Sequence, residues 1–186
     1  GKGYEVESGQ TFKDWRKQQL DKYGQTAIKD KLQAERLEKD RVRRSKEQFI
    51  AYRQVLGSQN MPKTFAGFYD LKYNDVEGYK ELKDRIRWAK SKFPTEKSLN
   101  GHFKSHGKEF GDITIEEYQK MASDLLSKPT SDKILGYQTE LRRVRYDIDN
   151  NIYVLGNPKV HKINTMFKPD LGREYYDGEI AKDLGN

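Results

Sequence analysis

The sequence predicts an α+β fold, in which an all-helical N-terminal segment precedes a small domain with two helices packed on an antiparallel meander of three to four strands. Helical spacing of apolar residues and helix-capping residues prevail up to about residue 128. After Gly136 the apolar residues alternate instead, and turn-forming residues separate the alternating runs. We therefore divide the 186 residues into a helical region, 1–97, and an α+β domain, 98–186.

The helical region is expected to contain five helices, each beginning at a residue that can cap a helix N-terminus: Thr11, Thr26, Ser45, Thr64 and Asp75. The first should end near Gly24, and the second should run to about residue 44. That second helix has too few apolar residues to fill a buried stripe, so we expect it to be exposed or to need a partner.

The α+β domain should open with two helices. Ser98 can cap a short helix over residues 99–106, and Thr114 with Glu117 has the spacing of a capping box, with a helix to about Ser127. Strands are predicted around residues 141–146, 152–155 and 160–167. Turn-forming residues at 147–150 and 156–158 separate these strands, as in β-hairpins.

Charge differs between the two regions. Residues 1–97 carry 23 Lys and Arg against 15 Asp and Glu, a net charge of +8, whereas residues 98–186 carry 13 against 14, a net charge of −1. Acidic and basic residues are interleaved in the basic region, as in Asp30-Lys31 and Glu38-Lys39. A solvated helix face and a contact with nucleic acid both fit this pattern.

Composition excludes several classes of function. The chain has no cysteine, which excludes disulfide scaffolds, cysteine-ligated zinc sites and a cysteine nucleophile. No stretch of 18 apolar residues is present, so no membrane-spanning helix and no membrane partner are expected.

All three histidines lie in the second region. His102 and His106 are four residues apart, on one face of the predicted short helix. They are compatible with a polar helix end, with a metal site that would need His161 as third ligand, or with acid–base chemistry near pH 7. Phe103 stands where a zinc protease would have its glutamate, and we predict no metal and no cofactor.

Candidate companions for the histidines lie on the strands. Arg143 and Arg145 share one strand face, and Thr165 and Phe167 alternate on the last strand. An arginine that balances phosphate charge, a hydroxyl that bonds a phosphate oxygen and an aromatic ring that stacks on a base would suit a phosphodiester site. The same residues also fit an ordinary sheet, in which Phe167 belongs to the core.

Several segments carry a resemblance to a known family. The run 101–111 (GHFKSHGKEFG) with Glu117-Tyr118, and the later segments 145–147 (RYD), 151–154 (NIYV) and 163–169 (INTMFKP), resemble toxin-type ribonuclease domains of the barnase–EndoU–colicin–RelE-like fold. Such domains occur at the C-termini of bacterial polymorphic toxins and of phage head proteins. The match covers about residues 98–177, and the preceding region is similar to that of phage minor head (phage Mu F-like) proteins.

The resemblance implies a metal-independent endoribonuclease that acts on RNA, with transfer RNA as one substrate class. The 2′-OH would attack the neighbouring phosphorus and leave a cyclic phosphate, which requires RNA. The catalytic residues implied by the resemblance are His102, His106, Arg145 and Thr165. The RNA-binding residues implied are Lys104, Arg143 and Phe167.

The resemblance also bears on partners and location. It implies a phage virion or, after delivery, the bacterial cytoplasm, and an immunity protein as a further partner. The alternative is a non-enzymatic phage minor head or internal protein, whose residues 1–97 contact DNA or the capsid through their net charge of +8. A third function, ADP-ribosyl transfer, is disfavoured because no Glu-x-Glu pair lies on a predicted strand.

Overall fold

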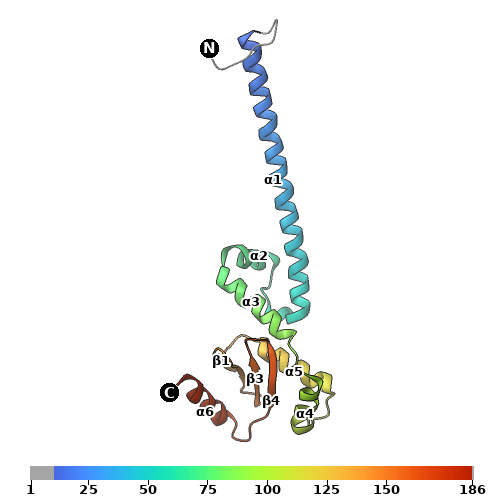
Figure 1. Ribbon diagram of the computed structural model, residues 1–186, viewed down its shortest axis with the longest axis vertical. Coiled ribbons are helices and arrows are strands. Elements are labelled where there is room, and N and C mark those ends of the chain that lie inside the picture. Colours follow the sequence, from blue (N-terminus) through green and yellow to red (C-terminus); the bar gives the residue numbers. More distant parts are fainter. Residues whose placement is uncertain (1–10, 186) are drawn as a thin grey trace. The chain divides into compact units, whose positions relative to one another are not determined.

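The computed structural model describes residues 11–185. Its helices are α1 (Phe12–Leu56), α2 (Phe65–Asn74), α3 (Val76–Ala89), α4 (Glu96–His106), α5 (Ile115–Ser127) and α6 (Arg173–Leu184), with 3-10 turns η1 (Ser58–Asn60) and η2 (Gly107–Phe110) (Figure 1). The strands are β1 (Ile134–Gln138), β2 (Arg143–Asp147), β3 (Ile152–Asn157) and β4 (Lys162–Phe167). The chain divides between Gln48 and Phe49 into two units, and α1 supplies residues to both.

Helix α1 is continuous where the sequence predicts three helices. Gly24 does not end it, because one glycine costs a helix only about 1 kcal/mol relative to alanine. Thr26 does not cap a new helix; its hydroxyl donates a hydrogen bond to the Lys22 carbonyl oxygen, one turn earlier (3.0 Å). Ion pairs one turn apart, such as Arg43 with Asp40, connect the exposed side chains.

The start of the second unit is helical as predicted. Thr64 and Asp75 cap α2 and α3, since their side chains accept hydrogen bonds from the backbone N–H groups of Gly67 and Gly78. A small apolar cluster joins the end of α1 to these helices, with Leu56, Met61, Leu82 and Ile86 at its centre. This cluster packs α3 against the C-terminal end of α1 and the segment that follows it.

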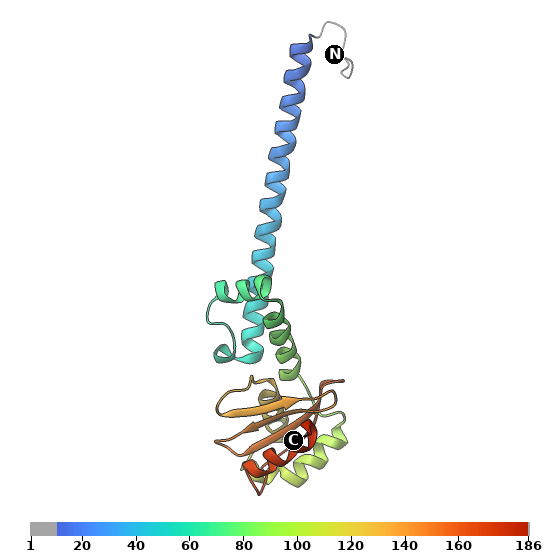
Figure 2. The same cartoon turned by 90° about the vertical axis from the view of Figure 1, so that its left-hand side faces the viewer.

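The four strands form one antiparallel sheet in the order β1-β2-β3-β4 (Figure 2). The meander and the α+β class are therefore confirmed, and the capping box of Thr114 with Glu117 opens α5 as predicted. Strand β1 and helix α6 were not predicted. Tyr176 and Ile180 of α6 share their helix face with Glu179 and Asp183, which pair with Arg142, so the sequence shows no clear apolar stripe there.

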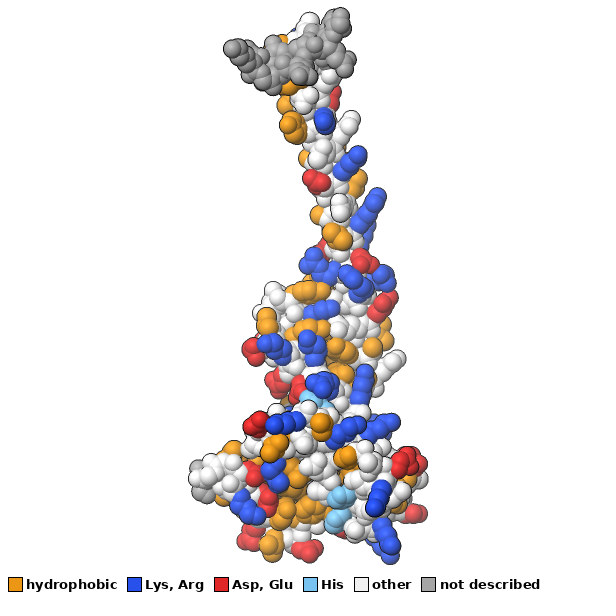
Figure 3. All heavy atoms as spheres, in the orientation of Figure 1, with side chains coloured by type: hydrophobic (Ala, Val, Ile, Leu, Met, Phe, Trp, Pro, Cys, Tyr) orange, Lys and Arg blue, Asp and Glu red, His pale blue; other side chains and the backbone are white. Residues whose placement is uncertain are grey.

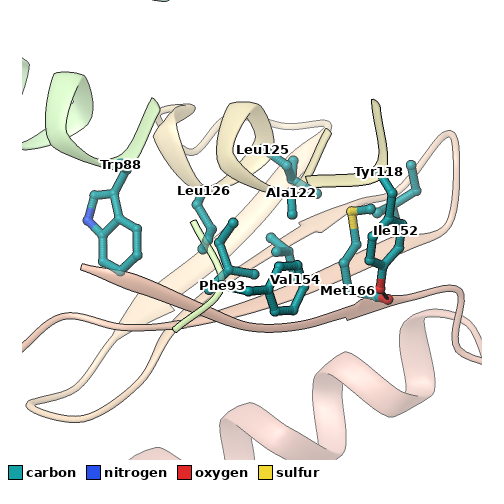
Figure 4. Close-up of a cluster of buried hydrophobic side chains, with 10 residues drawn as sticks. Trp88, Phe93, Tyr118, Ala122, Leu125, Leu126, Ile152, Val154 and Met166 are labelled. Atoms are coloured by element: carbon teal, nitrogen blue, oxygen red, sulfur yellow. Dashed lines mark hydrogen bonds between the residues drawn. The ribbon is translucent and has the colours of Figure 1, made fainter. Parts of the chain in front are cut away.

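Helices cover both faces of the sheet. On one face, Tyr118, Ala122 and Leu126 of α5 pack against Val154 and Met166 (Figure 4). On the other face, a cluster of tyrosines packs under α6: Tyr137, Tyr146, Tyr153 and Tyr176.

The core on the α5 side includes residues that precede the predicted boundary at 97/98. Trp88 is fully buried and Phe93 is 4% exposed, and both belong to the cluster beneath α5. Gly156 is required opposite Trp88, because a Cβ there would lie 2.6 Å from the indole ring. The predicted division at 97/98, into a basic helical region and an α+β domain, therefore stays a prediction about function.

None of the helices among residues 11–185 has an apolar stretch long enough to cross a membrane.

Candidate active site

An irregularity in the edge strand β4 decides which way its side chains point. Leu155 pairs with Thr165, but the next residue, Gly156, pairs with Ile163, so Asn164 is an extra residue in β4. Ile163 and Met166 consequently face the core beneath α5. Thr165 and Phe167 take the opposite face and remain half-buried. The bulge thus separates the polar pair from the apolar residues beside it.

Helix α4 brings the two histidines to this edge. It begins one turn earlier than predicted, because the Thr95 hydroxyl accepts a hydrogen bond from the Ser98 N–H (3.0 Å) and Ser98 lies inside the helix. Aromatic rings then follow one another: Phe93 to His102 (5.3 Å between ring centroids), His102 to His106 (6.3 Å) and His106 to Phe167 (5.5 Å). The ring of the buried Phe93 stacks on the imidazole of His102 and so helps to fix its position.

His102 contacts the hydroxyl predicted to accompany it. Its Nδ1 lies 3.2 Å from the Oγ1 of Thr165, across 63 residues of sequence. Burial lowers the pKa of His102, and the neighbouring imidazole of His106 lowers it further. Both causes disfavour the charged imidazolium. His102 is therefore held in its neutral form near pH 7, which is the form from which a general base begins.

His106 has a carboxylate partner that the sequence analysis missed. Its Nδ1 lies 2.7 Å from Oε2 of Glu109, and Oε1 of the same carboxylate accepts a hydrogen bond from the Lys168 backbone N–H (2.7 Å). A carboxylate at Nδ1 places the hydrogen on that nitrogen and leaves Nε2 for other partners. The spacing of three residues in His106-x-x-Glu109 was a usable signal, but only the fold reveals the link to β4.

Two surface hollows meet at His106. The first, here the α4 hollow, has a volume of about 570 Å³ and is lined by Lys97, Ser98 and Ser105 together with both histidines. The second, here the ring hollow, has a volume of about 450 Å³ and includes Phe167, Lys168 and Tyr175. Figure 3 shows histidine atoms at the surface between α4 and β4, with hydrophobic atoms on one side and basic side chains on the other.

The structure does not bring Arg143 and Arg145 to the histidines. They lie on the α5 side of the sheet, 6% and 7% exposed, and Nε of each donates to a carbonyl oxygen at the end of α5: Leu126 for Arg143 (2.8 Å) and Lys128 for Arg145 (2.9 Å). Burial, followed by the charge of Arg145, lowers the pKa of Arg143 to about 10. Burial also lowers the pKa of Arg145. Both side chains stabilise the C-terminus of α5, where cations are favoured.

Other predicted residues lie apart from the hollows. Lys104 is exposed on the far side of α4 from His102, about 200° around the helix. His161 sits in the β3–β4 turn, where its Nε2 lies 2.7 Å from Oδ1 of Asp84. Within residues 11–185, no three His, Asp or Glu side chains are grouped closely enough to hold a metal ion.

The sequence matches no protein-family model and no curated protein.

Proposed function

We propose that the chain is an endoribonuclease whose acid–base pair is His102 and His106, carried on a protein of the phage minor head type. The observation that carries this proposal is the pairing of each histidine with a different polar group, Thr165 for His102 (3.2 Å) and Glu109 for His106 (2.7 Å), beside open hollows. Two imidazoles one helix turn apart, each fixed through Nδ1, direct two Nε2 atoms to one substrate.

In the proposed reaction, Nε2 of His102 removes the proton of the ribose 2′-OH. The 2′-oxygen then bonds to the adjacent phosphorus while the bond from phosphorus to the 5′-oxygen breaks. His106 gives its Nε2 proton to that leaving oxygen, so the products carry a 2′,3′-cyclic phosphate and a 5′-hydroxyl. The lowered pKa of His102 supports its assignment as the base.

Thr165 has two roles in this proposal. Its Oγ1 accepts the Nδ1 hydrogen of His102, which fixes the tautomer with a lone pair on Nε2. Its own hydroxyl hydrogen can then bond a non-bridging phosphate oxygen, where charge grows during the attack. Phe167 and Tyr175, whose rings lie 5.3 Å apart, offer apolar surfaces on which bases can stack.

The test is cleavage of RNA by the whole chain in EDTA, with the chain also assayed after His102→Ala and His106→Ala. The whole chain is needed because a fragment that starts at residue 98 lacks Trp88 and Phe93, and loss of such buried aromatic side chains costs about 3–5 kcal/mol each. We expect each variant to lose about 10²–10⁴-fold in rate.

His161→Asn is the matched control, because His161 lies outside both hollows and has a positive φ of 50°, which asparagine tolerates. It should cleave RNA at the parent rate at 25 °C. Intact RNA with the parent chain, with and without a divalent metal, would contradict the proposal.

A second candidate is a non-enzymatic phage head or internal protein that contacts DNA or the capsid. It is favoured by α1, whose residues 12–56 hold 13 Lys and Arg against 7 Asp and Glu and are mostly exposed. Duplex DNA binding, measured by fluorescence anisotropy in the parent and in a Lys29→Gln, Lys31→Gln, Lys39→Gln triple variant, tests it. This function requires tight binding that the triple variant weakens and that falls steeply with salt.

A further inference from the structure

A third hollow continues the two that meet at His106. It lies between α5 and the β2–β3 turn, has a volume of about 380 Å³, and is lined by apolar side chains such as Phe110 and Ile152 with Lys128 and Lys168 at its rim. Lys168 also lines the ring hollow. The α4 hollow, the ring hollow and this third hollow therefore follow one another, with His106 and Lys168 as the shared residues.

We infer that the three hollows form one track for a single RNA strand, an inference that rests on the proposed ribonuclease function. The strand would pass the histidines with its reacting phosphate and continue over Lys168 into the third hollow. Each hollow contains a lysine together with an aromatic ring or the two histidines. Lys97 lies beside the histidines, Lys168 beside Phe167, and Lys128 beside Phe110. Lysine contacts phosphate, and apolar rings receive bases.

Three lysines and four carboxylates line the track, so a phosphate would have to be held by individual lysines and not by a net positive charge; three of the four carboxylates are already hydrogen-bonded or ion-paired. Glu109 is bonded to His106 and to the Lys168 N–H, Asp124 is paired with Lys120 (3.1 Å), and Asp147 accepts two hydrogen bonds from Asn150. Asp170, at the exposed rim, is the exception.

The side-chain ammonium groups of the track lysines, unlike most of its carboxylates, have no ion-pair or hydrogen-bond partner among the described residues. Lys97, Lys128 and Lys168 form no ion pair with any residue from 11 to 185, since the pairs of this part of the chain involve other lysines. Lys168 instead rests its Nζ over the ring of Phe110, 5.7 Å from its centroid. Their charges are consequently available to phosphate groups.

A single strand fits this track and a duplex does not. In an RNA helix the bases are stacked and paired, so they cannot turn outward onto the rings of Phe167, Tyr175 and Phe110. Three successive hollows on different elements also require a backbone that bends between nucleotides, which a single strand allows. The inferred substrate class is therefore unpaired RNA of at least three nucleotides.

Binding of non-cleavable strands separates this inference from catalysis. The probes are fluorescent 2′-O-methyl RNA oligonucleotides of two to eight nucleotides, which lack the attacking hydroxyl, with the whole chain and anisotropy as the readout. We expect affinity to rise with length until the three hollows are filled and then to level off. A hairpin duplex of equal length should bind at least tenfold more weakly.

Lys128→Gln is the decisive variant, and Lys90→Gln is its matched control. Both lysines directly follow a helix, α5 and α3, and Lys90 lines none of the three hollows. Lys128→Gln should weaken the long strands several-fold, lower the slope of log affinity against log salt by about 0.7, and leave the dinucleotide unchanged. Lys90→Gln should change none of these.

The outcomes distinguish the two proposals. Equal behaviour of Lys128→Gln and Lys90→Gln, affinity that stops rising at two nucleotides, or tighter binding of the duplex would each overturn the track, even if the parent chain cleaves RNA. Length-dependent binding that Lys128→Gln weakens would support the track, even if no RNA were cleaved and the ribonuclease proposal failed.

Discussion

Two groups of basic side chains flank the same sheet and differ in what surrounds them. Arg143 and Arg145 lie beneath the end of α5, where they are buried and donate hydrogen bonds to carbonyl oxygens. His102 and His106 lie at the β4 edge, where each has one partner at Nδ1 and borders an open hollow. Arginine donors that already have acceptors contribute stability, whereas the hydrogen bonds of His102 and His106 within residues 11–185 involve Nδ1 and not Nε2.

The comparison shows why residue type alone is a poor guide to function. All four residues were chosen from the sequence as members of a phosphodiester site, because arginine and histidine both suit phosphate chemistry. The structure divides them by burial and by the acceptors nearby. Basic side chains close to a helix C-terminus donate hydrogen bonds to its free carbonyl groups. Their positive charge then stabilises the helix and does not bind phosphate.

The largest effect should follow from replacing Arg145 by methionine. Arg145→Met leaves the Lys128 carbonyl oxygen without its side-chain donor, which costs about 1–3 kcal/mol, and it also removes the bond to the Val144 carbonyl oxygen, where a hydrogen bond contributes about 0.5–1.5 kcal/mol. We expect the free energy of unfolding to fall by about 2–4 kcal/mol, which corresponds to a drop of roughly 5–15 °C in Tm. Thermal denaturation followed by circular dichroism measures this.

The same variant sharpens the comparison through its activity. RNA cleavage at 15 °C, where the variant is folded, should match that of the parent chain. Loss of cleavage with an unchanged Tm would instead make Arg145 a phosphate-binding residue, as the resemblance to toxin ribonucleases implies, and the division between the two groups would be wrong.

A smaller effect is expected at Glu109. Glu109→Ala removes the carboxylate that bonds Nδ1 of His106 and the Lys168 N–H, and hydrogen bonds to charged groups contribute about 1.5–3 kcal/mol. Because Glu109 acts through His106, kcat for RNA should fall roughly 10–100-fold while KM changes little. Glu109→Gln, which keeps an acceptor oxygen, should recover most of the rate. Equal loss in both variants would show that the charge matters more than orientation.

Much of the fold was predictable because it depends on local signals. The capping residues Thr64, Asp75 and Thr114 begin helices as predicted, and the first hairpin turn lies where the turn-forming residues predict it. The second turn lies at residues 158–161, later than the predicted 156–158, because Gly156 and Asn157 still belong to β3. The single helix α1 was not predicted, since capping residues inside it, such as Thr26, bond the preceding turn instead. Helix α6 left no clear periodic signal, because Glu179 and Asp183, the partners of Arg142, lie on the same face as its apolar residues.

The candidate site was predictable only in part, because its contacts join distant segments. His102 and Thr165 are both implied as catalytic residues by the resemblance, and the structure places Nδ1 of one 3.2 Å from Oγ1 of the other. The bulge at Asn164, which turns Thr165 and Phe167 away from the core beneath α5, is invisible in an alternating pattern. Tyr175 was missed because its helix was missed.

A loss smaller than that at Glu109 is expected at Thr165. Thr165→Val keeps the branched shape of the side chain but removes the hydroxyl that lies 3.2 Å from Nδ1 of His102. An ordinary hydrogen bond contributes about 0.5–1.5 kcal/mol, so the cleavage rate should fall by roughly 2–10-fold with little change in Tm. Thr165→Ser keeps the hydroxyl and is the control. A rate equal to the parent's in Thr165→Val would remove Thr165 from the proposed mechanism.

The smallest effect is the pH dependence that His102 gives to stability. Because burial lowers the pKa of His102 in the folded chain, the unfolded chain takes up the proton first as the pH falls. The stability that this histidine contributes is therefore present above its ordinary pKa, near 6.5, and is lost as the pH falls through the lower pKa of the folded state. His102→Gln has no such group, so between pH 7.5 and pH 5 its Tm should fall less than that of the parent chain.

Arginines 143 and 145 cannot produce this difference, because they remain charged over the whole range and are the same in both chains. His106 and His161 are present in both chains, so residue 102 is the only histidine position that differs between them. Differential scanning calorimetry of the two chains across this range measures the effect. A parent chain that loses no more stability in acid than His102→Gln would mean that His102 is not desolvated when folded, and its assignment as the base would lose its physical reason.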